Sequence, residues 1–375
     1  MNIDWLKEAE KISDDIYSWR EFFHKNPELG NNEFKTAEKI EEILNGLNIK
    51  TQRILGTAVI GLLEVEGSKT CVAIRSDIDA LPIKEETGLE FSSINEGIMH
   101  ACGHDIHIVG ALAAAKILSI HKDKLKNSVK FFFQPNEEGD GGAKRMIDEG
   151  AMQNPAGSFV RGAQVQPHLP LGCIGLKSGP LYAYPMPVDA SFIGKSAHAA
   201  KRHLGKDALA AAAYFTTEIL KFNCKLNVVT VGSFHSGKVC NIIADKAEIL
   251  ITVRSLTDKS RSDIVKKINK LKNKTEKLFG VQVVLNINMN GQNVDNPKSG
   301  FLKAKKVAEK IFKDKIHLEE ASMYAEDFGN FIKHNDGCFF HIGVGGEYPL
   351  HNSHFAPDTK AAFYIAAMHA ALCSE

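Results

Sequence analysis

The sequence predicts an α/β fold in which a domain with a largely parallel sheet is interrupted by a smaller ferredoxin-like α+β domain. Three observations support this prediction. The chain of 375 residues is longer than one hydrophobic core usually organises. Its first half alternates helical and strand patterns, as βαβ units do. From residue 184 the pattern changes to two strand–helix–strand units.

The first part of the chain, residues 1–183, contains the βαβ pattern. Helices are predicted where apolar residues recur at steps of three and four: residues 5–24, 36–47, 106–121 and 141–149. Strands are predicted where β-forming residues cluster: residues 58–65, 71–77 and 128–134. Because ligands bind at the carboxyl ends of the strands in such sheets, we expect the active site there.

Pro185, Met186 and Pro187 mark a joint, and residues 184–295 form the predicted inserted domain. Its expected elements are a strand, a helix, two strands, a helix and a strand: residues 188–193, 207–222, 226–234, 246–254, 261–279 and 281–289. The α/β pattern resumes in residues 296–375, with two helices and one strand: residues 301–312, 359–373 and 338–342. We therefore expect the first and last parts to form one domain.

The composition excludes several classes of protein. Forty-six basic and 45 acidic residues leave a net charge of +1, so no clustered positive field for nucleic acid or an anionic membrane is expected. No apolar stretch approaches the ~18 to 20 residues that span a bilayer, and the amino terminus lacks the pattern of a signal peptide. The seven cysteines form no CxxC pair, which argues against a disulfide framework. We expect a cytoplasmic protein.

One short segment, MHACGHDIH at residues 99–107, brings a thiol, three imidazoles and a carboxylate together just before a predicted helix. Cys102 and His104 are ligand types that suit Zn, Mn, Co or Ni. The segment could instead be a turn in which Asp105 caps the helix. A nucleophilic cysteine is the third interpretation, although a base so near on the same turn cannot easily align with the thiol. The residues alone leave all three open.

Carboxylates follow two of the predicted strands. Glu137 and Glu138 come shortly after the strand at residues 128–134. Adjacent side chains on a loop point in different directions, so one could bind an ion while the other faces the water that the ion activates. Asp77 and Asp79 lie at the end of another strand, where one acid could hold a metal ligand in place. The alternative for both pairs is an ordinary solvated or capped loop.

The remaining candidate patterns are weaker. His351 and His354 lie near the carboxyl end, after a glycine-rich stretch. Glu326 and Asp327 form an acidic pair that could simply favour a helix dipole. A phosphate-loop-like spacing at residues 232–238 is followed by Val239, where a magnesium-binding hydroxyl belongs, so nucleotide binding is not expected.

Taken together, these segments resemble the amidohydrolase branch of the M20 metallopeptidases, which includes hippurate hydrolases, auxin-conjugate hydrolases, aminoacylases and N-acetyldiaminopimelate deacetylases. The resemblance covers nearly the whole chain. It lies in HKNPELG, RSDIDALP, MHACGHD, QPNEEG, GKSAHA, AEDF and the Leu350-His351 pair. It implies that the inserted domain is a lid and dimerisation domain, that the protein is a homodimer, and that its substrate is an N-acyl amino acid.

The resemblance also implies roles for individual residues. The ligands of two divalent ions (Mn, Zn, Ni or Co) would be Cys102, His104, Glu138 and His351. Glu137 would be the general base, and Asp79 would support the ligands. His198 would donate to the oxyanion in the partner subunit's active site. Asn241 and Arg254 lie in segments similar to those that hold the substrate.

One position departs from the family pattern. Members carry a ligand histidine in a Gly-x-His-x-x-Pro context, and Gln164 occupies that position here. An amide oxygen is a poorer donor than imidazole toward such cations, so one of the two ions is expected to bind weakly. His168 is the nearest substitute, but it lies roughly 13 Å along an extended chain at ~3.3 Å per residue. A second departure, the basic run Lys201-Arg202-His203, could favour an acidic substrate.

The sequence therefore predicts a cytoplasmic, dimeric, metal-dependent amidohydrolase that removes the acyl group, an acetyl group for example, from an N-acyl amino acid. N-Acetyldiaminopimelate is one candidate substrate. Two alternatives remain. Gln164 could indicate a homologue that binds a ligand or metal and is impaired in catalysis, and the same scaffold could serve a dipeptidase or carboxypeptidase.

Overall fold

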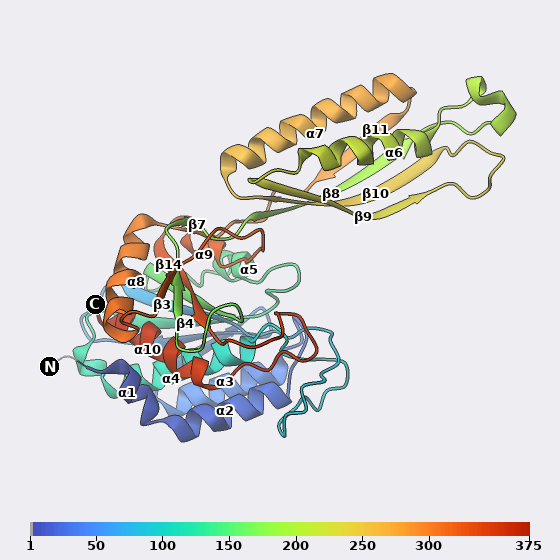
Figure 1. Ribbon diagram of the computed structural model, residues 1–375. Coiled ribbons are helices and arrows are strands. Elements are labelled where there is room, and N and C mark those ends of the chain that lie inside the picture. Colours follow the sequence, from blue (N-terminus) through green and yellow to red (C-terminus); the bar gives the residue numbers. More distant parts are fainter. Residues whose placement is uncertain (1–2) are drawn as a thin grey trace. The chain divides into compact units, whose positions relative to one another are not determined.

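A computed structural model describes residues 3–375, which fold into two compact units (Figure 1). The larger unit runs from the start of the described chain to Gly179 and also contains Asp295–Glu320 and Asp327–Glu375. The smaller unit contains Pro180–Val294 and Ala321–Glu326. The chain thus leaves the larger unit, builds the smaller one and returns.

The larger unit is built on an eight-stranded sheet with the order β1-β2-β4-β3-β5-β14-β6-β13. The strands are β1 (Lys50–Ile54), β2 (Ala58–Leu63), β3 (Cys71–Asp77), β4 (Ser128–Gln134), β5 (Gly157–Gln166), β6 (Ile174–Leu176), β13 (Ile316–Leu318) and β14 (Asp336–Gly343). The central strands β4, β3, β5 and β14 are parallel to one another. Their carboxyl ends therefore meet at one edge of the sheet.

Helices cover this sheet: α1 (Trp5–Glu10), α2 (Ser13–Lys25), α3 (Phe34–Gly46), α4 (His104–Ile120), α5 (Ala143–Asp148), α8 (Lys298–Ile311), α9 (Gly329–Ile332) and α10 (Lys360–Ser374). A short 3-10 helix, Lys122–Lys124, follows α4. Helices α4 and α10 pack against each other and are buried along nearly their whole length. They are apolar on almost all sides, as expected of helices inside a core.

The smaller unit contains a four-stranded antiparallel sheet with the order β11-β8-β10-β9. The strands are β8 (Tyr184–Ile193), β9 (Asn227–Ser236), β10 (Lys246–Ser255) and β11 (Gln282–Ile287). Alternate residues of β8 and β10 are buried, and α6 (Ala208–Ile219) and α7 (Asp258–Phe279) cover that face (Figure 1). The order β-α-β-β-α-β is that of a ferredoxin-like layer. Short 3-10 helices lie at Ala199–Leu204 and Leu220–Phe222, and β7 (Gly179–Pro180) pairs with β12 (Asp295–Asn296).

The predicted fold class is confirmed, and the differences are local. The helix predicted at residues 5–24 is two helices, because Ile12 has the non-helical angles φ −110° and ψ 27°. The sequence analysis also missed β5, which ends in Gly-Ala-Gln-Val-Gln. Its side chains are buried from Phe159 onward although several are polar, so the usual apolar strand pattern is absent. This omission matters because Gln164 lies on β5.

Candidate metal centre

The candidate site lies where α4 begins, beside the carboxyl ends of β3, β4 and β5. Cys102 and His104 flank Gly103, which has φ +79° and lies immediately before the helix. A Cβ atom at Gly103 would lie 2.5 Å from Cγ2 of Val165 on β5. Glycine therefore permits both the left-handed turn and the close approach of this segment to the strand.

Two overlapping groups of side chains bring possible metal ligands together. Cys102, Glu138 and His351 each offer one ligand atom, and these atoms lie within 4.8 Å of one another. The same holds for His104, Glu137 and Glu138. We call these five residues the ligand cluster. Glu138 belongs to both groups, so its carboxylate could serve either of two ions.

Distances within the ligand cluster leave room for an ion. His351 Nε2 lies 3.0 Å from Glu138 Oε1, and His104 Nε2 lies 3.9 Å from the same oxygen. Glu137 Oε2 lies 4.0 Å from His104 Nε2. His351 itself has φ +64°, a left-handed conformation that is uncommon for a residue with a side chain. Such backbone conformations tend to persist where the surrounding structure requires them, often at functional sites.

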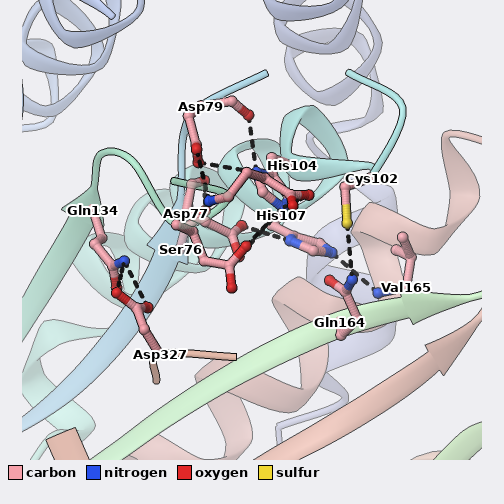
Figure 2. Close-up of polar contacts among 12 residues, drawn as sticks. Ser76, Asp77, Asp79, Cys102, His104, His107, Gln134, Gln164, Val165 and Asp327 are labelled. Carbon is pink, nitrogen blue, oxygen red and sulfur yellow. Dashed lines mark hydrogen bonds and ion pairs between the residues drawn. The ribbon is translucent and has the colours of Figure 1, made fainter. Parts of the chain in front are cut away.

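Hydrogen bonds to Asp79 and Asp77 orient the imidazole rings of His104 and His107 (Figure 2). Nδ1 of His104 lies 2.9 Å from the carbonyl oxygen of Asp79, so this nitrogen carries the proton and Nε2 is free to coordinate. His107, one turn later, is held by Asp77 Oδ1 at 2.7 Å, and its Nε2 accepts the backbone N–H of Val165 at 3.0 Å. Both ring nitrogens of His107 thus make hydrogen bonds within the protein, whereas Nε2 of His104 faces the ligand cluster.

The electrostatics of the ligand cluster favour a cation. Burial, together with the negative charge of Glu138, raises the pKa of the Cys102 thiol to about 12. Burial alone would lower the pKa of His104, but the charges of Asp77 and Cys102 and the hydrogen bonds to Asp79 and Cys102 together outweigh it and raise this pKa well above its usual value. A divalent ion would supply the positive charge that stabilises a thiolate and a neutral imidazole here, and both are the ligand forms that metals bind.

A buried oxygen provides a structural test of whether these residues fit a metal. Gln164 Oε1 is buried and makes no hydrogen bond, and the buried Glu138 Oε1 has the ion pair with His351 at 3.0 Å. A buried acceptor left unpaired is costly, so such an atom calls for an unseen partner. One thiol, two imidazoles and two carboxylates form a donor set suited to Zn, Mn, Co or Ni. The residues present therefore fit divalent metal ions.

Gln164 lies on β5 and faces the ligand cluster, as expected of the position where the family pattern has a ligand histidine. Its Nε2 donates a hydrogen bond to Cys102 Sγ at 3.2 Å, and Figure 2 shows the side chain reaching toward the thiol. His168 has a different environment: its side chain is exposed, and its Nε2 lies 3.3 Å from both carboxylate oxygens of Glu319. The nearest alternative histidine thus interacts with another carboxylate.

The other residues singled out from the sequence belong to the smaller unit. His198 is exposed, and its Nδ1 accepts the backbone N–H of Ala200 at 3.1 Å. Asn241 is also exposed, and its carbonyl accepts the backbone N–H of Ala199. Arg254 is partly buried on β10, which lowers its pKa. None of these three belongs to the ligand cluster of the larger unit.

Sequence reasoning gave no role to several residues that support the site. Asp327 accepts hydrogen bonds from the backbone N–H groups of Gly142 and Ala143, both at 2.9 Å, and from Gln134 Nε2 at 2.8 Å. It thereby holds the loop after β4. The sequence analysis treated Asp327 only as one of an ambiguous acidic pair, because nothing local relates it to a loop so distant along the chain.

The chain is similar to known proteins of one peptidase family. The sequence pattern of peptidase family M20/M25/M40 matches residues 73–373. The N-acetyldiaminopimelate deacetylase of Oenococcus oeni is 35% identical over 362 residues, which cover 91% of this chain and 93% of the relative. That of Oceanobacillus iheyensis is 34% identical over 351 residues, covering 91% of this chain and 94% of the relative.

Solved structures are similar over the full length. A putative aminohydrolase from methicillin-resistant Staphylococcus aureus has a TM-score of 0.94 and 29% identity, covering 100% of this chain and 99% of that one. The Bacillus subtilis YXEP protein, described as a dinuclear metal-binding peptidase, has a TM-score of 0.88 and 29% identity, covering 97% and 98%.

The fold and the site define an amide hydrolase with candidate ligands for divalent metals. More specifically, the chain belongs to peptidase family M20. The resemblance noted in the sequence and the prediction of an amide-hydrolysing enzyme are thus confirmed. Within the described residues, no helix has both the length and the apolar character needed to cross a bilayer.

Proposed function

We propose that the protein removes the acetyl group from an N-acetyl amino acid, using water activated by two divalent metal ions. N-Acetyldiaminopimelate is the first candidate substrate, because the curated relatives named above are deacetylases of that compound. The observation that carries the proposal is the convergence of Cys102, His351, His104 and Glu137 in two groups that share Glu138.

Each residue of the ligand cluster has a distinct task in this proposal. Cys102, His104, Glu138 and His351 would hold the ions, and Glu138 belongs to both ligand groups. When bound, such ions polarise the scissile carbonyl and lower the pKa of a water molecule. Glu137 would accept a proton from the attacking water and return it to the leaving amine.

Residues of the smaller unit complete the proposed mechanism. His198 would donate a hydrogen bond to the oxyanion, acting in the partner subunit of a homodimer formed through the smaller unit. Arg254 would pair with the substrate carboxylate, since its guanidinium suits bidentate contact, and Asn241 would support the bound acyl group. Asp79 would keep His104 oriented through its carbonyl. The enzyme would act in the cytoplasm.

The experiment that tests this proposal is an activity screen with one decisive variant. The protein is freed of metal and reloaded separately with Mn²⁺, Zn²⁺, Co²⁺ or Ni²⁺. Release of amine is then measured from N-acetyldiaminopimelate, other short N-acyl amino acids, and dipeptides. We expect hydrolysis of an N-acetyl amino acid, reduced roughly 10²- to 10⁴-fold in the Glu137→Gln variant.

The matched control is Glu149→Gln, the same substitution at an exposed position after α5, which should keep full turnover. Full turnover in Glu137→Gln would rule out the assigned base. Hydrolysis of dipeptides alone would favour the peptidase alternative, and no hydrolysis with any metal would favour the impaired homologue suggested by Gln164.

A further inference from the structure

A buried carboxylate distant in sequence holds the loop that carries Glu137 and Glu138. Glu33, which precedes α3, is fully buried. Its Oε1 accepts the backbone N–H of Asn136 at 2.9 Å, and its Oε2 accepts the hydroxyl of Thr57 at 2.8 Å. Asn136 is the residue immediately before the two glutamates, so this bond fixes the backbone at the point where the catalytic segment begins.

The side chain of Asn136 is itself enclosed. A Cβ atom at Gly30 would lie 2.1 Å from Asn136 Oδ1, and one at Gly139 would lie 2.3 Å from the same atom. The side chain therefore fits only because both neighbours are glycines. Asn136 also has φ +55°, a left-handed conformation that asparagine tolerates better than most residues. The left-handed backbone, the enclosed side chain and the hydrogen bond to Glu33 thus all fix the position of Asn136.

Other contacts hold the rest of the loop. Asp79 Oδ2 accepts the backbone N–H of Glu138 at 3.0 Å, and Asp327 accepts those of Gly142 and Ala143. Asp79 also contacts the proposed ligand His104, so its substitution would disturb the metal centre directly. Glu33 belongs to neither ligand group, which makes its effect on the loop separable from coordination.

We propose that Glu33 is a positioning residue, which acts through Asn136 to set the directions of Glu137 and Glu138. This inference rests on the proposed function and deepens it. A general base and a metal ligand side by side on one loop must both keep their geometry. A displacement of about 1 Å at such groups can cost about 10²-fold in rate. Residues that orient metal ligands from behind typically contribute 10- to 100-fold in metal affinity or activity.

Four variants separate the effect of the Glu33–Asn136 hydrogen bond from the effect of burying the Glu33 side chain. Glu33→Ala removes both hydrogen bonds of the carboxylate. Glu33→Gln keeps an oxygen for the Asn136 N–H, and the Thr57 hydroxyl can turn to accept from the new amide group. Gly30→Ala displaces Asn136 from the opposite side. Thr57→Val, the matched control, removes the other partner of Glu33 and leaves the bond to Asn136 in place.

The readouts are kcat and KM at saturating metal, and hydrogen exchange of the peptide that contains residues 134–139. In Glu33→Ala and Gly30→Ala we expect kcat to fall about 10²-fold with KM changed by no more than about threefold. Exchange of the loop amides should accelerate, while α4 and α10 keep their protection. Glu33→Gln and Thr57→Val should stay within about threefold of wild type in kcat.

The inference is overturned if Glu33→Ala keeps wild-type kcat and loop exchange, or if Thr57→Val loses as much as Glu33→Ala. Should Glu33→Ala fail to fold, Gly30→Ala and Glu33→Gln decide the question, and an unaffected loop in Gly30→Ala counts against it. If the wild type hydrolyses no acyl amino acid, the proposed function fails. Hydrogen exchange then still determines whether Glu33 holds the loop.

Discussion

Two clusters of ionisable side chains share one stretch of chain, and they differ in how far their charges compensate one another. His104 faces the ligand cluster, whereas the next residue, Asp105, faces a second group. We call Arg20, His24, Glu85 and Asp105 the ionic cluster. Asp105 Oδ2 accepts a hydrogen bond from Arg20 Nη1 at 2.6 Å and lies 2.5 Å from His24 Nδ1. His24 Nε2 lies 3.0 Å from Glu85 Oε1.

The charges of the ionic cluster compensate one another. Although burial acts to raise it, the charges of Arg20 and His24 hold the pKa of Asp105 far below its usual range. The ligand cluster instead contains a thiol whose pKa is raised to about 12, and it lies beside the unbonded buried oxygen of Gln164. The difference teaches that a network of mutually compensating charges joins α2 to α4 and stabilises the fold, although Arg20 Nε makes no hydrogen bond. The ligand cluster instead offers donor atoms that fit divalent metal ions.

The largest expected effect is on folding. Asp105→Asn removes a negative charge that Arg20 and His24 both contact, and it leaves the buried Arg20 charge without the carboxylate that it is bonded to. We expect the free energy of unfolding to fall by about 3 to 5 kcal/mol, measured by urea denaturation of the metal-free protein. Asp123→Asn, at an exposed position, is the control and should change little. A loss below about 1 kcal/mol would mean that the ionic cluster contributes little to stability.

The next effect separates the ligand cluster from the ionic cluster. Cys102→Ser should weaken metal binding by more than about 100-fold, because a thiolate ligand is replaced by a hydroxyl. The stability of the metal-free protein should stay nearly unchanged, since the substitution preserves the shape of the side chain. Equilibrium dialysis with elemental analysis measures the binding, and Cys240→Ser, at an exposed position, is the control. Unchanged metal content would remove Cys102 from the ligand set.

A smaller effect is expected at the position where the family pattern has histidine. Gln164→His places an imidazole beside Cys102 in place of an amide. We expect the weaker of two bound ions to bind about tenfold more tightly, visible as a second equivalent of Mn²⁺ or Zn²⁺ retained in dialysis. If neither the stoichiometry nor the affinity changes, position 164 does not limit metal binding.

The pH dependence of stability should follow the ionic cluster. Burial acts to lower the pKa of His24, but Asp105 and Glu85 outweigh it and raise this pKa. The contribution of His24 is therefore complete below its unfolded pKa near 6.5 and is lost as the pH rises through its folded pKa. Although burial acts to raise it, hydrogen bonds from His24 and Thr87 lower the pKa of Glu85 to about 2. Its contribution is complete above about pH 4.5 and is lost as the pH falls toward 2.

The contribution of the ionic cluster to the free energy of unfolding, measured by urea denaturation, should therefore be highest between about pH 4.5 and 6.5. Glu85→Gln should flatten the acidic side of the profile, and Asp105→Asn should flatten both sides. A wild-type profile that keeps rising above pH 7 would show that His24 does not titrate as its contacts require.

The sequence predicted the features that depend on local patterns and missed those that depend on distant pairs. Cys102 and His104 stand out because they share one short segment, and Glu137 and Glu138 because they follow a clear strand. Glu33 could not be found in this way, since its partner Asn136 is far away along the chain.

The same reason explains why Asp105 was expected only to cap a helix. It does accept the backbone N–H of Ile106 at 2.8 Å. Its stronger partners, Arg20 and His24, come from α2, and only the tertiary fold brings them within reach.

The most direct measurement of the central claim is anomalous diffraction from crystals of the zinc-loaded protein. We predict a peak bonded to Cys102 Sγ at about 2.3 Å, with Glu138 and His351 at about 2.0 to 2.2 Å. Zinc density found only elsewhere, with Cys102, Glu138 and His351 bonded to one another, would contradict the claim that these residues form a metal centre.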